Sequence, residues 1–249
     1  MLREPGTEAG TTGMFAVPRA GCAGAASAGE GTGLPGAGYT ASMHATAGSR
    51  VIPANHYLRS RWRNGRGWTR EICAAGASEG QWDWRLSIAD IEQAGPYSAF
   101  PGTTREQVLL QGEGLRLQFP DGRTGDLRPP YGRIRFDGGE PPQAVPDARV
   151  EVFNLIWRPL AVEVDLWHRP LVGPMLFFAD TDSRWALHLL AGQARFEGGA
   201  LPPLAQGDTA VLDESARRRF LLDGGGELLA IRIRPCGTGG AGSPVASGD

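Results

Sequence analysis

Short apolar runs separated by turn-forming residues are the feature of this chain that most restricts its fold. The runs 108–110, 115–119, 150–157 and 228–233 are rich in Val, Leu, Ile and Phe, and Gly, Pro and Asp separate them. Many such runs in succession are typical of the strands of a β-sandwich or barrel. The best helix candidate, 87–92, is equally well a strand end that runs into Gly95-Pro96. The sequence therefore predicts an all-β fold.

An internal repeat narrows this expectation. Residues 109–117 (LLQGEGLRL) resemble 189–196 (LLAGQARF), 80 residues later, and each copy predicts a hairpin closed by a glycine turn. A turn with Gly and Asp follows each copy, and an apolar strand ending in Arg-Pro closes it, at 152–159 and 228–235. This order of elements resembles the core of a cupin barrel. Two copies predict a bicupin, in which two β-barrel or jelly-roll halves pack together.

Composition divides the chain into four parts. Residues 1–50 hold eleven glycines and no apolar periodicity, so we expect a disordered extension there, or a true start at Met43. Residues 51–159 are expected to form the first barrel and residues 160–235 the second. The glycine-rich segment 236–249 is expected to be a disordered tail.

Charge and cysteine usage exclude several classes of partner. The formal net charge is −2 and the pI is about 6.1, so nucleic acid is not an expected partner. Cys22, Cys73 and Cys236 have no paired spacing, which fits a reducing compartment, and Cys73 is interpreted as a small core residue rather than a nucleophile. No apolar run approaches the roughly 18 residues of a membrane span, and the amino terminus lacks the apolar segment of a signal peptide. We therefore expect a cytoplasmic protein without a membrane partner.

Tryptophan and arginine are concentrated in residues 62–88, which hold four of each. Indole offers a large apolar face and one N–H donor, and guanidinium offers a planar fork that matches a carboxylate. The chain has no HxH or Cx2C motif and no phosphate-binding glycine loop. The segment therefore predicts a partly buried polar pocket that binds a ligand more readily than it catalyses a reaction.

Motifs in and after this segment resemble those of the HutD/Ves family. The matching stretches, in the order of the family, are 62–72 (WRNGRGWTREI), 83–88 (DWRLSI), 95–102 (GPYSAFPG), 109–115 (LLQGEGL) and 153–158 (FNLIWR). Arg66 replaces the middle glycine of the first motif, and Val152 replaces an aspartate at the start of the last. The resemblance implies a metal-free RmlC-like bicupin that acts in the regulation of histidine utilisation or, in the Ves branch, in stress. It implies no catalytic activity.

Eight residues are candidates for ligand binding: Asn64, Thr69, Glu71, Trp84, Arg85, Ser87, Phe100 and Asn154. Arg85 is the leading anion-binding candidate because its fork can hold both oxygens of a carboxylate, and Glu71 is expected to pair with it. Structural alternatives stand beside these roles. Asn64 also fits a hairpin tip, Glu71 a rim salt bridge, Trp84 a core position and Asn154 an internally bonded amide.

Histidine spacing argues against a metal site. His44, His56, His168 and His188 lack the i, i+2 pair that metal-binding cupins place on one strand. We therefore expect no metal, no other cofactor and no catalytic residue. Asp165 and His168 form the one local acid–histidine pairing, and the run 217–219 (RRR) is expected to be a solvated turn.

Three functions fit these features. The favoured one is a non-catalytic regulatory protein that binds a small acidic metabolite such as urocanate or formylglutamate. The alternative is a metal-independent, isomerase-like cupin enzyme acting on a small acid or sugar, which needs a histidine oriented by a carboxylate inside the barrel. A third is an assembly role, and the chain is a candidate homodimer.

Overall fold

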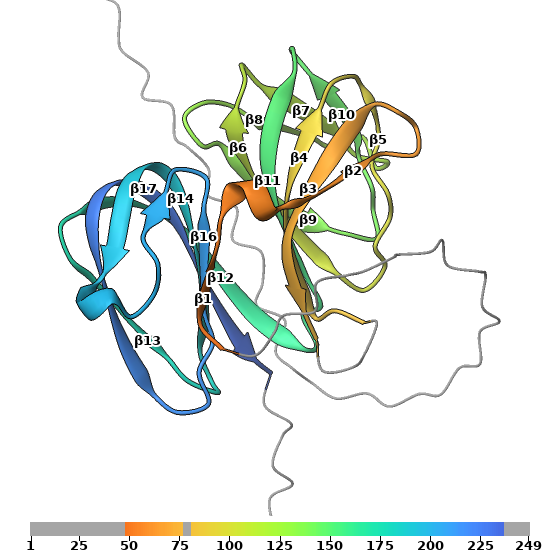
Figure 1. Cartoon of the computed structure of the whole chain (residues 1–249). Coiled ribbons are helices and arrows are strands. Elements are labelled where there is room, and N and C mark those ends of the chain that lie inside the picture. Colours follow the sequence, from red (N-terminus) through yellow and green to blue (C-terminus); the bar gives the residue numbers. More distant parts are fainter. Residues whose placement is uncertain (1–47, 77–80, 237–249) are drawn as a thin grey trace, which may run out of the picture. The chain divides into compact units, whose positions relative to one another are not determined.

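The computed structural model describes residues 48–76 and 81–236, and strands make up most of this part of the chain (Figure 1). Two short 3-10 turns, Ala54–His56 and Glu197–Gly199, are the helical elements among these residues. The all-β prediction is confirmed. The disorder expected for residues 1–50 and 236–249 falls almost entirely outside the described residues.

Six antiparallel strands form the sheet that carries most of the motifs, in the order β2-β3-β4-β11-β6-β9. They are β2 (Leu58–Arg61), β3 (Gly67–Ala75), β4 (Trp84–Ile91), β6 (Thr104–Gln111), β9 (Arg133–Asp137) and β11 (Val150–Trp157). The helix candidate 87–92 lies mostly in β4, so its strand alternative is the correct one. The reason is tertiary, since β4 is paired along its whole length between β3 and β11.

A four-stranded sheet completes the first half, in the order β5-β10-β7-β8. Its strands are β5 (Gly95–Pro96), β7 (Leu115–Gln118), β8 (Thr124–Leu127) and β10 (Gln143–Pro146). Leu117 and Leu127 of this sheet pack with Ile91, Leu109 and Val152 of the six-stranded sheet in one buried cluster. The two sheets therefore enclose a common core.

The second half is one seven-stranded sheet, in the order β1-β16-β14-β17-β12, with β13 on β17 and β15 on β14. The strands are β1 (Arg50–Ile52), β12 (Val162–Val172), β13 (Met175–Ala179), β14 (Arg184–Phe196), β15 (Leu204–Ala205), β16 (Thr209–Leu212) and β17 (Arg218–Pro235). This sheet has its own core, which includes Phe177, Phe196 and Phe220. β1 pairs with β16, so residues 50–52 belong to this sheet rather than to the barrel expected to begin at residue 51.

The internal repeat forms two corners rather than two hairpins. In the first copy β6 pairs with β9 and β11, whereas β7 pairs with β8 and β10, so the chain changes sheets near Gly112. In the second copy residues 189–196 stay within β14, whose register shifts between Leu189 and Ala191. The hairpin prediction is therefore wrong. Gly112 (φ +107°) and Gly192 (φ +86°) turn the chain at equivalent positions of the repeat, but the segments before and after each glycine do not pair with each other.

A third buried cluster joins the two halves. Trp84, Leu86 and Phe153 of the six-stranded sheet pack there with Leu229 and Ile231 of β17. Successive side chains of a strand point to opposite faces of its sheet. The other face of the six-stranded sheet therefore points into the first barrel.

Candidate functional site

A row of polar side chains crosses the inner face of the six-stranded sheet. Strand pairing places Ser87 of β4, Asn154 of β11 and Gln107 of β6 side by side. One step along the same strands, Arg85 and Arg105 flank Ile156. The polar residues Ser87, Arg105, Gln107 and Asn154 are buried. Polar side chains are mostly exposed in folded proteins, so a buried row of them is unusual.

Arg105 is the group in this row whose charge is not matched. Its side chain is buried, its Nη2 donates to Asn154 Oδ1 over 3.1 Å, and its Nη1 reaches the Ser98 carbonyl at 3.5 Å. Its Nε is buried and has no hydrogen-bond partner. Within residues 48–76 and 81–236, no carboxylate forms an ion pair with it.

Aromatic rings surround the same guanidinium. Its carbon lies 4.7 Å from the ring centre of Tyr97, 5.2 Å from that of Phe136 and 5.6 Å from that of Phe100. Burial, together with the nearby charge of Arg85 and against the opposing effect of Tyr97, lowers the pKa of Arg105 to about 10. The group is still a cation at neutral pH, and the ring faces stabilise that cation.

A hydrogen-bond network fixes the amides beside Arg105. Gln107 Nε2 donates to Asn154 Oδ1 over 3.3 Å, and Asn154 Nδ2 donates to Ser87 Oγ over 3.4 Å. Gln107 also contacts the Tyr97 hydroxyl at 3.3 Å, and burial raises the pKa of that phenol. Asn154 thus presents its carbonyl oxygen to Arg105, and its orientation follows from these bonds.

Arg85 has the acidic partner that was expected. Its Nε and Nη2 donate to the same oxygen of Glu71, over 2.9 and 2.7 Å. Both side chains are largely buried, with 13% and 16% of their surfaces exposed. Because Glu71 neutralises Arg85, Arg105 supplies the excess positive charge of the cluster.

Four of the eight predicted residues, Glu71, Arg85, Ser87 and Asn154, lie in the polar row on this inner face, and the ring of Phe100, from the segment before β6, lies against Arg105. Thr69 lies on the same face, opposite Ala89, but its hydroxyl accepts a bond from the indole of Trp62 over 2.9 Å. The Thr69 hydroxyl is therefore bonded within the β2–β3 hairpin rather than to the group around Arg105.

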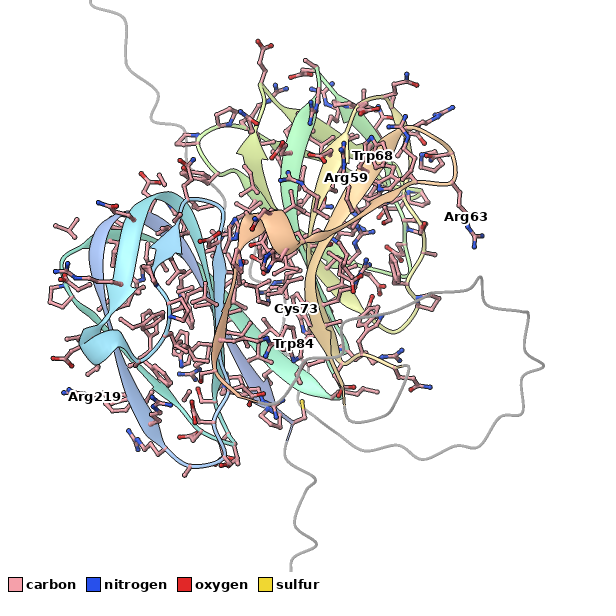
Figure 2. The ribbon with its side chains drawn as sticks, in the orientation of Figure 1. Arg59, Arg63, Trp68, Cys73, Trp84 and Arg219 are labelled. Carbon is pink, nitrogen blue, oxygen red and sulfur yellow. The ribbon has the colours of Figure 1, made fainter. Side chains whose placement is uncertain are left out.

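Asn64 and Trp84 lie away from the inner face around Arg105. Asn64 is exposed in the β2–β3 turn, where its Oδ1 accepts the backbone N–H of Arg66 over 3.0 Å. Trp84 points away from the barrel interior and is buried in the cluster between the halves (Figure 2). The alternation along β4 puts Trp84 and Arg85 on opposite faces.

Arg105, Gln107 and Tyr97 were not among the predicted site residues. Arg105 and Gln107 are two positions apart on a strand that also carries Val108 and Leu109, so their shared face was visible in the sequence. Gln107 is also a mid-strand amide, but of the two the sequence predicted a binding role only for Asn154. Arg105 and Gln107 come close to Asn154 only because β6 pairs with β11, and the local sequence does not show this pairing.

The remaining titratable candidates take structural positions. Cys73 is buried, and burial raises the pKa of its thiol to about 12, which favours the core interpretation over a nucleophile. His168 is exposed and pairs with Glu227 across the sheet at 2.8 Å, whereas Asp165 pairs with Arg234. Arg217, Arg218 and Arg219 are exposed, His56 is exposed in a 3-10 turn, and His44 lies outside the described residues.

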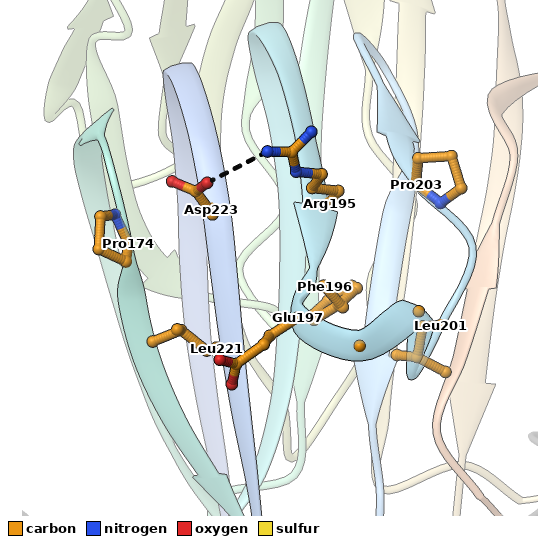
Figure 3. Close-up of a pocket in the computed structure, with 10 residues that line it drawn as sticks. Pro174, Arg195, Phe196, Glu197, Leu201, Pro203, Leu221 and Asp223 are labelled. Carbon is orange, nitrogen blue, oxygen red and sulfur yellow. Dashed lines mark ion pairs between the residues drawn. The ribbon is translucent and has the colours of Figure 1, made fainter.

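A surface pocket of about 690 Å³ lies in the second half (Figure 3). Its apolar lining includes Phe196, Leu201 and Leu221. Its charged residues pair with one another or with a neighbour, Arg195 with Asp223 at 3.8 Å and Glu197 with Arg219 at 3.0 Å. The unmatched charge of Arg105 is absent from this pocket, so the first barrel is the stronger candidate site.

The described part of the chain lacks two further features. No group of three or more His, Cys, Asp or Glu side chains there is arranged to hold a metal ion. No helix among those residues is long and apolar enough to cross a membrane.

Comparison with known proteins finds relatives of similar sequence. The family described as HutD matches residues 54–230. An uncharacterized 21.2 kDa protein from the hutC 3' region of Pseudomonas putida is 37% identical over 112 residues, 44% of this chain and 58% of that protein. Protein Ves of Escherichia fergusonii is 40% identical over 67 residues, 27% of this chain and 35% of Ves. Each match spans less than two thirds of the relative.

A solved structure extends the similarity to the fold. HutD from Pseudomonas fluorescens SBW25, in a formate condition, is 27% identical with a TM-score of 0.65, and the match covers 76% of this chain and 100% of that one. The fold is that of an RmlC-like bicupin. With a match over residues 54–230 of 249, which includes the inner face around Arg105, this chain belongs to the HutD family.

Proposed function

We propose that this protein binds a small organic acid without transforming it, and that Arg105 holds the carboxylate of that acid. The observation that carries the proposal is a buried guanidinium without an ion pair among the described residues and with an unpartnered Nε. Burying an uncompensated charge is costly unless something neutralises it. A carboxylate supplies the opposite charge and matches the planar fork of arginine.

The surroundings of Arg105 favour a small ligand with an apolar or aromatic body. The rings of Tyr97, Phe100 and Phe136 supply apolar contact on the barrel side. The Ser98 carbonyl, only weakly bonded to Arg105 at 3.5 Å, belongs to an exposed segment before β6. We infer that an incoming carboxylate takes the place of this carbonyl.

A regulatory role in histidine utilisation is the second part of the proposal. The Pseudomonas putida relative is described as a protein of the hutC 3' region, and the Pseudomonas fluorescens HutD structure is described as a formate condition, formate being the smallest carboxylate. Urocanate and formylglutamate are therefore the first acids to test. Cytoplasmic location and homodimer formation also stay predictions.

The enzyme alternative has less support. Its requirement was a histidine inside the barrel with a carboxylate on its ring, and His168 has the carboxylate but is exposed. The sequence 76–80 (GASEG) has the GxSxG spacing of a serine nucleophile, but residues 77–80 lie outside the described part of the chain. The groups near Arg105, which are Ser87, Asn154, Gln107 and the paired Arg85, are better suited to binding a ligand than to transferring a proton.

Thermal unfolding in the presence of acids tests the proposal. A ligand at about a hundredfold excess over its Kd stabilises the protein by about 2.7 kcal/mol, which is a measurable rise in Tm. We expect urocanate or formylglutamate to give this rise and Arg105→Met to abolish it. Arg63→Met is the matched control, since Arg63 is exposed at the β2–β3 turn and points away from the barrel (Figure 2). A rise retained in Arg105→Met, or none with any acid at millimolar concentration, contradicts the proposal.

A further inference from the structure

The apolar rows that join the two halves end in a polar group. β12 directs Val162, Val164 and Leu166 into the cluster between the halves, and β17 directs Leu229, Ile231 and Ile233 into it. The next position in the first row is His168 and the next in the second is Glu227. Because side chains of one face recur every two residues, both belong to the face that meets the first half.

These two side chains form a cluster with a tyrosine from the first half. His168 Nε2 lies 2.8 Å from Glu227 Oε2, and the Tyr131 ring centre lies 4.7 Å from that of His168. Burial raises the pKa of the Tyr131 hydroxyl, and the charge of Glu227 raises it further. About two fifths of the Glu227 and His168 side chains are exposed (41% and 38%), so solvent reaches the group.

A pocket of about 320 Å³ opens beside this cluster, with Tyr131 and Glu227 in its lining. Leu109, Leu110, Pro129 and Pro130 form its apolar walls. The volume is at the small end of the range for ligand pockets, which begins at about 300 Å³. The first half thus supplies apolar and aromatic walls, and the second half supplies the carboxylate.

The backbone holds Tyr131 in a strained conformation at this place. Its φ is +52°, the left-handed region that residues with a side chain rarely adopt. The Leu109 N–H donates to the Gly132 carbonyl over 2.9 Å, and the Gly132 N–H donates to the Arg128 carbonyl over 2.8 Å. These bonds keep the tyrosine ring beside Glu227, and strain of this kind concentrates at ligand sites.

We propose that this pocket binds a small organic cation, an ammonium or guanidinium group carried on an apolar body. Glu227 provides the opposite charge, the Tyr131 ring provides a face for the cation, and the leucine and proline walls receive the body. In the described residues the cation paired with Glu227 is His168, which is charged only when protonated. The site is thus opposite in sign to the Arg105 site and does not depend on it.

Calorimetric titration of the full chain at pH 7.5 tests the proposal with 3-methylbutylamine and the neutral 3-methyl-1-butanol as probes. We expect the amine to bind at least about tenfold more tightly than the alcohol, a difference of about 1.4 kcal/mol. Glu227→Gln keeps the shape and hydrogen bonding of the side chain, and it should weaken amine binding by at least about tenfold. Asp165→Asn, in the half-buried pair with Arg234, is the matched control and should leave amine binding unchanged.

Three outcomes overturn this proposal: equal affinity for amine and alcohol, unchanged amine binding in Glu227→Gln, and no amine binding at millimolar concentration. If Glu227→Gln fails to fold, the comparison of amine with alcohol on the natural chain still decides. Arg105→Met should bind the amine normally. Loss of acid binding and loss of amine binding are therefore separate results.

Discussion

At the scale of single residues, Arg105 carries a buried charge that no carboxylate among the described residues neutralises. Arg85 and Glu71 cancel one another, whereas Arg105 is held by an amide, a carbonyl and three aromatic rings. An isolated buried charge destabilises a folded protein, and such groups persist at functional sites, where stability is exchanged for binding. The ligand-free protein should therefore be less stable than its packing allows.

Replacing Arg105 by methionine tests this destabilisation without any ligand. Methionine fills a similar volume and removes the charge, so we expect Arg105→Met to unfold at equal or higher urea, with a gain of up to about 1–4 kcal/mol. Arg63→Met, in an exposed turn, should change stability by less than about 0.5 kcal/mol. A loss of more than about 2 kcal/mol in Arg105→Met would assign this arginine a structural role instead.

A buried histidine makes a second prediction at this scale. His188 Nδ1 contacts Thr209 Oγ1 at 3.0 Å, and its ring packs 5.1 Å from that of Phe153. Burial, together with the nearby charge of Arg70 and against the opposing charge of Asp208, lowers the pKa of His188 to about 4. In the unfolded chain a histidine binds its proton near pH 6.5, so acid favours unfolding. This part of the stability is complete above pH 6.5 and is lost as the pH falls toward 4.

Urea unfolding at pH 7 and pH 5 measures this effect. The His188 contribution should fall by about 2 kcal/mol between the two pH values. His188→Asn removes the titrating ring and should flatten the pH dependence by that amount, whatever its stability at pH 7. His56→Asn, at an exposed histidine, should keep the natural slope. An unchanged slope in His188→Asn would place the acid sensitivity elsewhere.

The sequence predicted the contacts of a side chain correctly where those contacts follow from its neighbours along the strand. The Glu71–Arg85 pair follows from the alternation along two strands and is present as expected. Arg105 was missed because its sequence, TREQV, resembles a solvated strand of alternating charge. Its burial arises from rings on β9 and on the segment before β6, which only the tertiary fold brings to it.

At the scale of elements, the repeat was predicted but its geometry was not. A Leu-Leu-x-Gly pattern marks a change of chain direction both in a hairpin and in a corner between sheets. The sequence does not tell whether the flanking strands pair with each other. Gly192 shows why glycine is needed at such a corner. Its φ is +86°, and a Cβ placed on it would lie 1.9 Å from the Gly225 carbonyl oxygen.

Alanine substitution in this part of the second sheet tests the corner. Gly192→Ala should lower the free energy of unfolding by more than about 2 kcal/mol, because both backbone conformation and close approach forbid a side chain. Gly225→Ala is the control on the paired strand, where a Cβ meets no atom within 4 Å, and should change it by less than about 0.5 kcal/mol. Similar losses from both substitutions in urea unfolding would show that the corner glycine has no special role.

At the scale of the whole molecule, the all-β class and the bicupin followed from turn spacing and family motifs. The exchange of β1 into the second sheet did not, because three residues before the first motif carry no sign of their distant partner β16. The two candidate sites also differ in origin. The Arg105 site lies within one barrel, whereas the pocket beside Glu227 needs both halves.

A crystal structure of the full chain with the acid that raises the Tm most is the most direct test of the central claim. We predict a carboxylate oxygen within about 3 Å of the Arg105 guanidinium, with the Ser98 carbonyl displaced from it. The acid bound in the pocket beside Arg195 and Phe196, with Arg105 still covered by Ser98, would contradict the account.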